Sequence, residues 1–231
     1  MKPNARLFRV SVVIFLAAVC TAASAQISKQ GSGYLLRMKF TKGDVARYTM
    51  TSASGGSGVP AMNLKMPMSM KVLSVAKGVG QIEYSVGPMT NNGKAVVQAQ
   101  KGTSKVDSRG KVTGSSAQLQ QMGNITFPEK AIRVGETWKG TQTTQTGPGG
   151  SLTLNASYTF AGIKTVKGKP VAEIKVSVSG ANQMMKTAGT GVMQLLVADG
   201  SLFSTTMDQT MTFAQGQQSM SVKNKTQIVR Q

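Results

Sequence analysis

Methionine is the residue type in this chain whose number and spacing could do chemistry. The 231 residues include 15 methionines, and residues 62–72 alternate six apolar side chains with polar ones. Met66, Met68 and Met70 belong to this stripe, and alternate residues of a β-strand lie on one face, about 6.6 Å apart. Because thioether sulfurs bind soft monovalent metals, these three methionines are candidate ligands for Cu(I) or Ag(I).

Two other interpretations of the methionine stripe involve no metal. Methionine adapts its shape to irregular cores, so the stripe could fill the interior of the protein. Flexible thioethers also suit an adaptable wall for a hydrophobic ligand. The sole tryptophan could likewise anchor a ligand or pack in the core. The candidate ligand-binding residues are Met62, Leu64, Met66, Met68, Met70, Trp138, Met207 and Met211.

Enzymatic chemistry has little support in the sequence. Histidine is absent and Cys20 is the only cysteine, which excludes Ser/His/Asp and Cys/His nucleophile arrangements. A pair of carboxylates, as in glycosidases, would need no histidine, but half of the eight acidic residues lie at expected turns. No glycine-rich phosphate loop joins a strand to a helix. We therefore expect a protein that is not an enzyme, with no catalytic residues and no cofactor.

Residues 1–25 have the pattern of a secretory signal peptide. Three basic residues precede the apolar run at residues 10–19, and Ala23-Ser24-Ala25 supplies a small-x-small cleavage site. We expect the mature chain to start at Gln26 and to be exported, either to the periplasm or to the extracellular space. A lipid anchor at Cys20 is not expected, because Val19 stands where the lipidation signal requires a small residue.

The chain is strongly basic, with a formal net charge of +19, or +16 once the three signal-peptide charges are removed. Dispersed positive charge is typical of a solvated outer face that keeps a β-protein soluble. It also favours attraction to an anionic envelope surface. Nucleic acid is not an expected partner, because the protein is exported and only 5% of its residues are aromatic.

The sequence resembles two copies of one β unit. Gly43 and Gly135, which begin equivalent strands, are 92 residues apart, and so are Asp107 and Asp199 at equivalent turns. We therefore predict a first repeat over residues 26–124 and a second over residues 125–231, packed as one domain.

Strict alternation of apolar and polar residues predicts half-buried antiparallel strands through most of the chain. We predict an all-β fold, an internally duplicated antiparallel barrel, half-barrel or sandwich. Few short helices are expected, with candidates at residues 115–122 and 182–187. Pro67 lacks an N–H group, so we expect an edge or a bulge at that point of its strand.

A family resemblance enters at residues 127–138, which read Phe-Pro-Glu-Lys-Ala-Ile-Arg-Val-Gly-Glu-Thr-Trp. This stretch resembles a signature, Pro-Glu-Lys followed by Val-Gly-acid-x-Trp, of exported bacterial β-proteins catalogued as a domain of unknown function. Residues 42–48 and 106–110 are similar to the same pattern. The resemblance implies an exported, strand-rich protein and supplies no catalytic residues. A looser likeness, in architecture alone, is to periplasmic lipoprotein carriers, whose curved sheet holds an acyl chain.

These observations favour a non-catalytic, exported binding protein of the cell envelope that carries a lipid or another hydrophobic ligand. One alternative is a structural or adaptor scaffold with a sealed core, whose protein partners the sequence does not identify. The other is a methionine-rich protein that binds Cu(I) or Ag(I).

Overall fold

Strands dominate the computed structural model, which describes residues 26–231 apart from 57–58, 114–124, 146–150 and 216–217. The described residues contain no helix, which confirms the all-β prediction. None of them, accordingly, forms a helix long and apolar enough to cross a membrane. The helix expected at residues 115–122 lies outside the described residues.

The helix expected at residues 182–187 is wrong, because this segment is a hairpin turn. Oδ1 of Asn182 accepts hydrogen bonds from the backbone N–H groups of Met184 at 3.0 Å and Met185 at 2.8 Å. An asparagine side chain that bonds the backbone two or three residues on mimics a turn. The chain therefore reverses here and continues as a strand from Met185.

Thirteen of the strands in the described part of the chain form one antiparallel sheet. In spatial order its main path runs β10 (Thr137–Gln145), β11 (Ser151–Val166), β12 (Lys169–Ala181), β13 (Met185–Leu196), β14 (Leu202–Gln215), β15 (Gln218–Arg230), β3 (Val45–Gly56), β4 (Val59–Ala76), β5 (Val79–Val86), β8 (Gln100–Val106) and β9 (Val112–Thr113). Off this path, β6 (Met89–Asn91) pairs with β4 and with β7 (Lys94–Val97). A separate hairpin consists of β1 (Ile27–Gln30) and β2 (Gly33–Leu36).

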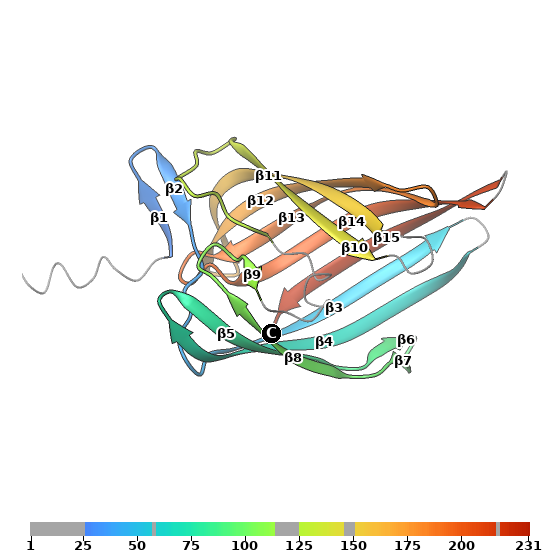
Figure 1. The fold of residues 1–231 in the computed structure, drawn as a ribbon, viewed down its shortest axis with the longest axis horizontal. Coiled ribbons are helices and arrows are strands. Elements are labelled where there is room, and N and C mark those ends of the chain that lie inside the picture. The colour runs from blue at the N-terminus through green and yellow to red at the C-terminus, as the bar shows by residue number, and fades with distance from the viewer. Residues whose placement is uncertain (1–25, 57–58, 114–124, 146–150, 216–217) are drawn as a thin grey trace, which may run out of the picture.

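The sheet is strongly curved but is not closed into a barrel (Figure 1). Its end strands among those described, β10 and β9, do not pair with each other. The arm from β10 to β14 and the arm from β3 to β8 lie on either side of a shared interior, as the layers of a sandwich do. We call the side of the sheet that faces this interior the concave face, and the opposite side the convex face.

The two predicted repeats contribute to the same sheet, because β15 of the second pairs with β3 of the first. Strands β3 and β10 begin at residues 45 and 137, and β4 and β11 begin at residues 59 and 151. Hairpin turns at Lys77 and Lys167 both have a φ of 49°. The duplication itself, with its boundary between residues 124 and 125, stays a prediction.

The main core occupies one end of the concave face and is covered by the β1–β2 hairpin and residues 125–132. Phe127 and Phe160 are completely buried in it. Tyr34 of β2 forms an isolated β-bridge with Ile132, which joins the hairpin to the covering segment. Arg37 reinforces this junction by donating hydrogen bonds to the carbonyl oxygens of Pro128 and Glu129 at 2.7 and 2.6 Å.

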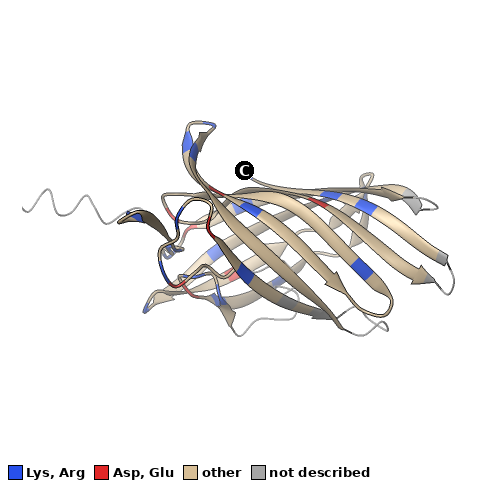
Figure 2. Cartoon of the chain, turned by 90° about the horizontal axis from the view of Figure 1, so that it is seen from above, with Lys and Arg blue, Asp and Glu red and all other residues tan. Residues whose placement is uncertain are grey.

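Polar and basic residues alternate onto the convex face. Lys101 pairs there with Glu83 at 3.0 Å, and Lys225 lies 3.9 Å from Asp208. Figure 2 shows lysine and arginine spread over several strands of the sheet rather than gathered in one patch. The convex face is therefore the hydrophilic side, and the concave face carries the apolar residues.

Candidate functional site

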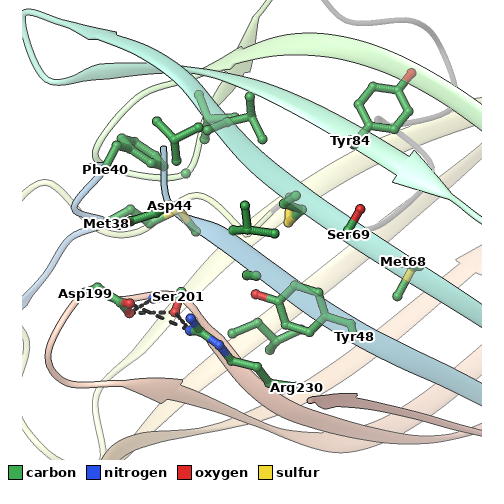
Figure 3. Close-up of a pocket in the computed structure, with 18 of the residues that line it drawn as sticks. Met38, Phe40, Asp44, Tyr48, Met68, Ser69, Tyr84, Asp199, Ser201 and Arg230 are labelled. Carbon is green, nitrogen blue, oxygen red and sulfur yellow. Dashed lines mark hydrogen bonds and ion pairs between the residues drawn. The ribbon is translucent and has the colours of Figure 1, made fainter. Parts of the chain in front are cut away.

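An apolar cavity lies on the concave face, between the two arms of the sheet (Figure 3). Its volume is about 260 Å³, slightly below the roughly 300–1,000 Å³ of typical small-molecule pockets. Lining residues come from β3, β4, β5 and β8 on one side and from β13, β14 and β15 on the other. Met38 and Phe40, which precede β3 in the chain, supply further apolar side chains. The site is thus assembled from segments that are far apart in the sequence.

Strand β4 forms one wall of the cavity, because the side chains of Met68, Met70 and Val72 alternate toward it. Tyr48 lies opposite Met68 on β3, and Tyr84 lies opposite Met70 on β5. Met68 and both tyrosines are buried, whereas Met70 keeps 37% of its surface exposed. A thioether that lines the interior and remains accessible is available to a bound molecule.

Two glycines create the space for aromatic rings in this wall. A Cβ atom on Gly80 would lie 2.7 Å from Cγ of Phe40, and one on Gly102 would collide with the hydroxyl of Tyr84. Glycine within a strand marks a place where another group approaches the backbone closely. Each ring therefore lies directly over a glycine of a neighbouring strand.

A polar group of three residues closes one end of the cavity beside Tyr48 (Figure 3). Nη1 of Arg230 donates a hydrogen bond to Oγ of Ser201 at 2.5 Å and lies 3.7 Å from Oδ2 of Asp199. Oδ1 of Asp199 accepts hydrogen bonds from the backbone N–H and the hydroxyl of Ser201, at 2.8 and 2.6 Å. Burial raises the pKa of Tyr48 to about 12, while the charge of Arg230 lowers it and that of Asp199 raises it.

A second polar feature lies on β8. Ser104 lines the cavity and is 3% exposed, and its Oγ has no hydrogen-bond partner among the described residues. An unsatisfied buried hydroxyl costs about 1–3 kcal/mol. The hydroxyl of Ser104 is therefore a buried, unsatisfied polar group in the wall of the cavity.

Farther along the strands, a row of polar side chains crosses the concave face. Oγ of Ser52 donates to Oδ1 of Asn224 at 2.6 Å, and Nε2 of Gln209 donates to Oγ1 of Thr187 at 2.7 Å. Ser52 of this row lies opposite Leu64 of β4. The continuous apolar surface beside the cavity therefore ends where this row begins.

Comparison with known proteins does not identify a family for this chain. No family model matches the chain, and no curated protein matches it. A crystal structure from Parabacteroides distasonis, of a protein provisionally described as a lipoprotein, is similar over 82% of this chain and 94% of that chain. The sequence identity is 9% and the TM-score is 0.43, so this likeness carries no conclusion about function.

The structure places the candidate ligand-binding residues of β4 on one face but brings only some of them to the cavity. Met68 and Met70 line it. Met62, Leu64 and Met66 alternate onto the same face beyond it, and Leu64 is paired with the polar row.

The remaining candidate residues lie in the second half of the chain and do not line the cavity. Trp138 stacks on Tyr158, with ring centroids 5.3 Å apart, and its Nε1 donates to the carbonyl oxygen of Thr126 at 3.1 Å. Trp138 and Met207 both pack against the main core. Met211 lies on the concave face opposite Thr187, at the polar row.

Sequence analysis did not single out the tyrosines, Phe40 or Arg230 as site residues. The sequence feature that could have identified them is their position within the alternating pattern of each strand. Arg230, for example, lies two residues after Ile228 on β15 and so falls on the same face. An arginine in phase with inward-facing apolar residues is expected to point to the interior. That phase becomes meaningful only once the buried face of the strand is known.

Metal binding by conventional ligands has no support in the described part of the chain, where no three His, Cys, Asp or Glu side chains come together. The thioethers of Met66, Met68 and Met70 share one face of β4. Their binding of a soft metal stays a prediction.

Proposed function

We propose that this protein is a non-catalytic, exported binding protein of the cell envelope that holds a hydrophobic ligand in the cavity of the concave face. The observation that carries this proposal is the cavity of about 260 Å³ with walls of methionine, tyrosine, valine and isoleucine. Burying apolar surface contributes about 25 cal/mol per Å². A ligand that covers the exposed part of Met70 gains this free energy.

The charge distribution supports an envelope location. The signal-like residues 1–25 favour export, and lysines of β4, β8 and β15 alternate with the inward-facing residues and so lie on the convex face. Basic residues near an anionic membrane surface contribute about 1 kcal/mol each to attraction. The basic convex face would hold the protein near anionic lipids while the concave face carries the ligand.

Binding of a neutral apolar fluorophore tests this function. The protein, produced with its own leader in a bacterial host, is titrated with Nile red, and dodecanol is then added as a competitor. The proposal predicts a saturable rise in fluorescence that dodecanol reverses. A folded protein that leaves Nile red fluorescence unchanged would contradict the proposal and favour the scaffold with a sealed core.

A soft-metal function is a second candidate, favoured by the position of one more methionine. Met50 on β3 lies directly opposite Met66 on β4, next to Met68 and on the same face. Directly opposed residues have Cβ atoms roughly 4.5–5.5 Å apart, close enough for their thioethers to share one ion. Native mass spectrometry with Ag(I) is expected to show one bound ion, lost when residues 66, 68 and 70 are all changed to leucine. An unchanged mass would contradict this function.

A further inference from the structure

The apolar cavity ends in a cationic side chain that has hydrogen-bond donors to spare. Arg230 lines the cavity, and its side chain is 24% exposed. Among the described residues the guanidinium forms a hydrogen bond only with Ser201 and an ion pair only with Asp199. A guanidinium has five N–H donors, and one hydrogen bond to Ser201 leaves most of them without a protein acceptor.

Asp199 does not use up these donors. Its Oδ2 lies 3.7 Å from Nη1 of Arg230, which is beyond hydrogen-bond distance. Its Oδ1 is occupied by the backbone N–H and the hydroxyl of Ser201. The carboxylate is thus held by its own turn, and it weakens the field of Arg230 without satisfying the N–H groups.

We propose that the ligand is a single-chain anionic amphiphile whose head-group oxygens accept hydrogen bonds from Arg230. This inference rests on the proposed function and specifies its ligand class. Carboxylate and phosphate share the required chemistry, because both accept two parallel hydrogen bonds from a guanidinium. The acyl chain would lie along Met68, Met70 and Tyr84, away from the polar end.

Volume and charge agree with this ligand class. A cavity of about 260 Å³ is at the small end of ligand pockets and suits one acyl chain better than two. A wholly neutral ligand would leave the donors of Arg230 facing an apolar surface without acceptors, which is unfavourable. An anionic head group removes that cost.

Competition against Nile red measures how much the head group contributes to the affinity, separately from the acyl chain. Dodecanoate, dodecyl phosphate and dodecanol have the same chain length and differ at the head. We expect both anions to bind about tenfold more tightly than dodecanol, since a hydrogen bond to a charged group stabilises by about that factor. Arg230→Gln is expected to abolish this preference, so that the three competitors bind with similar affinities. Preference for only one of the two anions would identify the head group.

Three further variants distinguish a ligand contact from a structural ion pair. Asp199→Asn keeps the turn acceptor and removes the competing charge, so it should tighten dodecanoate binding two- to threefold, roughly. Lys223→Gln removes a positive charge from the convex side of the same strand and should change nothing. Thermal unfolding of each variant verifies that it is folded, and Arg230→Lys, which keeps the charge, should retain part of the preference.

The outcomes are distinct. Equal binding of dodecanoate and dodecanol by the unmodified protein, or a preference that survives Arg230→Gln, would overturn the inference while leaving hydrophobic-ligand binding in place. Failure of Nile red and dodecanol to bind would overturn both.

Discussion

Arg230 on β15 lies directly opposite Tyr48 on β3, so a guanidinium and a buried phenol share one end of the apolar cavity. The two side chains come from the last strand of the chain and from the first strand of the large sheet. The pairing of β15 with β3 joins the strands of the second half of the chain to those of the first half in one sheet. The strand pairing that makes the sheet continuous therefore also places Arg230 and Tyr48 side by side in the cavity.

Alkaline unfolding tests the environment of Tyr48. Burial raises the pKa of Tyr48 from 10.0 to about 12, so the folded protein keeps this proton after the unfolded chain has lost it. The stabilisation linked to the proton is complete below pH 10 and is lost as the pH rises to about 12, at about 1.4 kcal/mol per pH unit. Relative to the Tyr48→Phe variant, the free energy of unfolding should fall only in that window. A constant difference from pH 8 to pH 12 would contradict the burial of the phenol.

Filling the cavity should abolish ligand binding. Met70→Trp places a larger side chain at a wall position that is 37% exposed, so it should reduce the affinity for Nile red at least tenfold. Val75→Trp is the matched control, because Val75 lies on the same strand, is 41% exposed and does not line the cavity. Equal loss of affinity in both variants would show that the probe binds elsewhere.

The unsatisfied hydroxyl of Ser104 predicts that its removal does not destabilise the ligand-free protein. Ser104→Ala removes a buried donor that has no partner among the described residues, so the ligand-free variant should be as stable as the parent or more stable by about 1 kcal/mol. Urea unfolding measures this difference. A loss of 1 kcal/mol or more would mean that the hydroxyl is satisfied in the folded protein.

Phe160 belongs to the part of the main core that does not line the cavity, so it tests whether binding depends on that part of the core. Its side chain is fully buried, lies 5.3 Å from the ring of Tyr34 and does not line the cavity. Phe160→Ala should cost about 3–5 kcal/mol of stability, while Nile red affinity should change little under conditions where the variant is folded. Val134→Ala, at a residue that is 59% exposed, should have no measurable effect on stability. A large loss of Nile red affinity in folded Phe160→Ala would mean that core and cavity are one unit.

The strands of this protein could be predicted because alternation is a local property. The stripe at residues 62–72 correctly indicated that Met68 and Met70 share a face, since successive side chains of a strand point to opposite sides. Pro67 was expected at an edge or a bulge. It lies between the β4 residues that pair with β5 and those that pair with β6, where β4 has no ladder partner on that side among the described strands and is locally an edge.

The cavity could not be predicted, because alternation does not show which strands become neighbours. Arg230 reaches Tyr48 only because the last strand pairs with β3, a contact between residues 182 positions apart in the sequence. Leu64 was predicted as a site residue from its own strand. Its cross-strand neighbour Ser52 belongs to the polar row, and no pattern within β4 reveals that neighbour.

The hairpin at Asn182 shows the limit of local signals for helices. A short segment that starts with Asn182 permits either a capped helix or a turn, and the long strands on both sides determine which of the two forms. Strands β12 and β13 pair from Ala181 and Lys186 onward. The pairing of β12 with β13 therefore requires the chain to turn between Ala181 and Lys186.

Native mass spectrometry of the full protein with dodecanoate tests the central claim most directly. The account predicts one bound dodecanoate per chain at micromolar ligand, lost in Met70→Trp and retained in Val75→Trp. A bare polypeptide mass at every ligand concentration, from a protein shown to be folded, would contradict a ligand-binding cavity on the concave face.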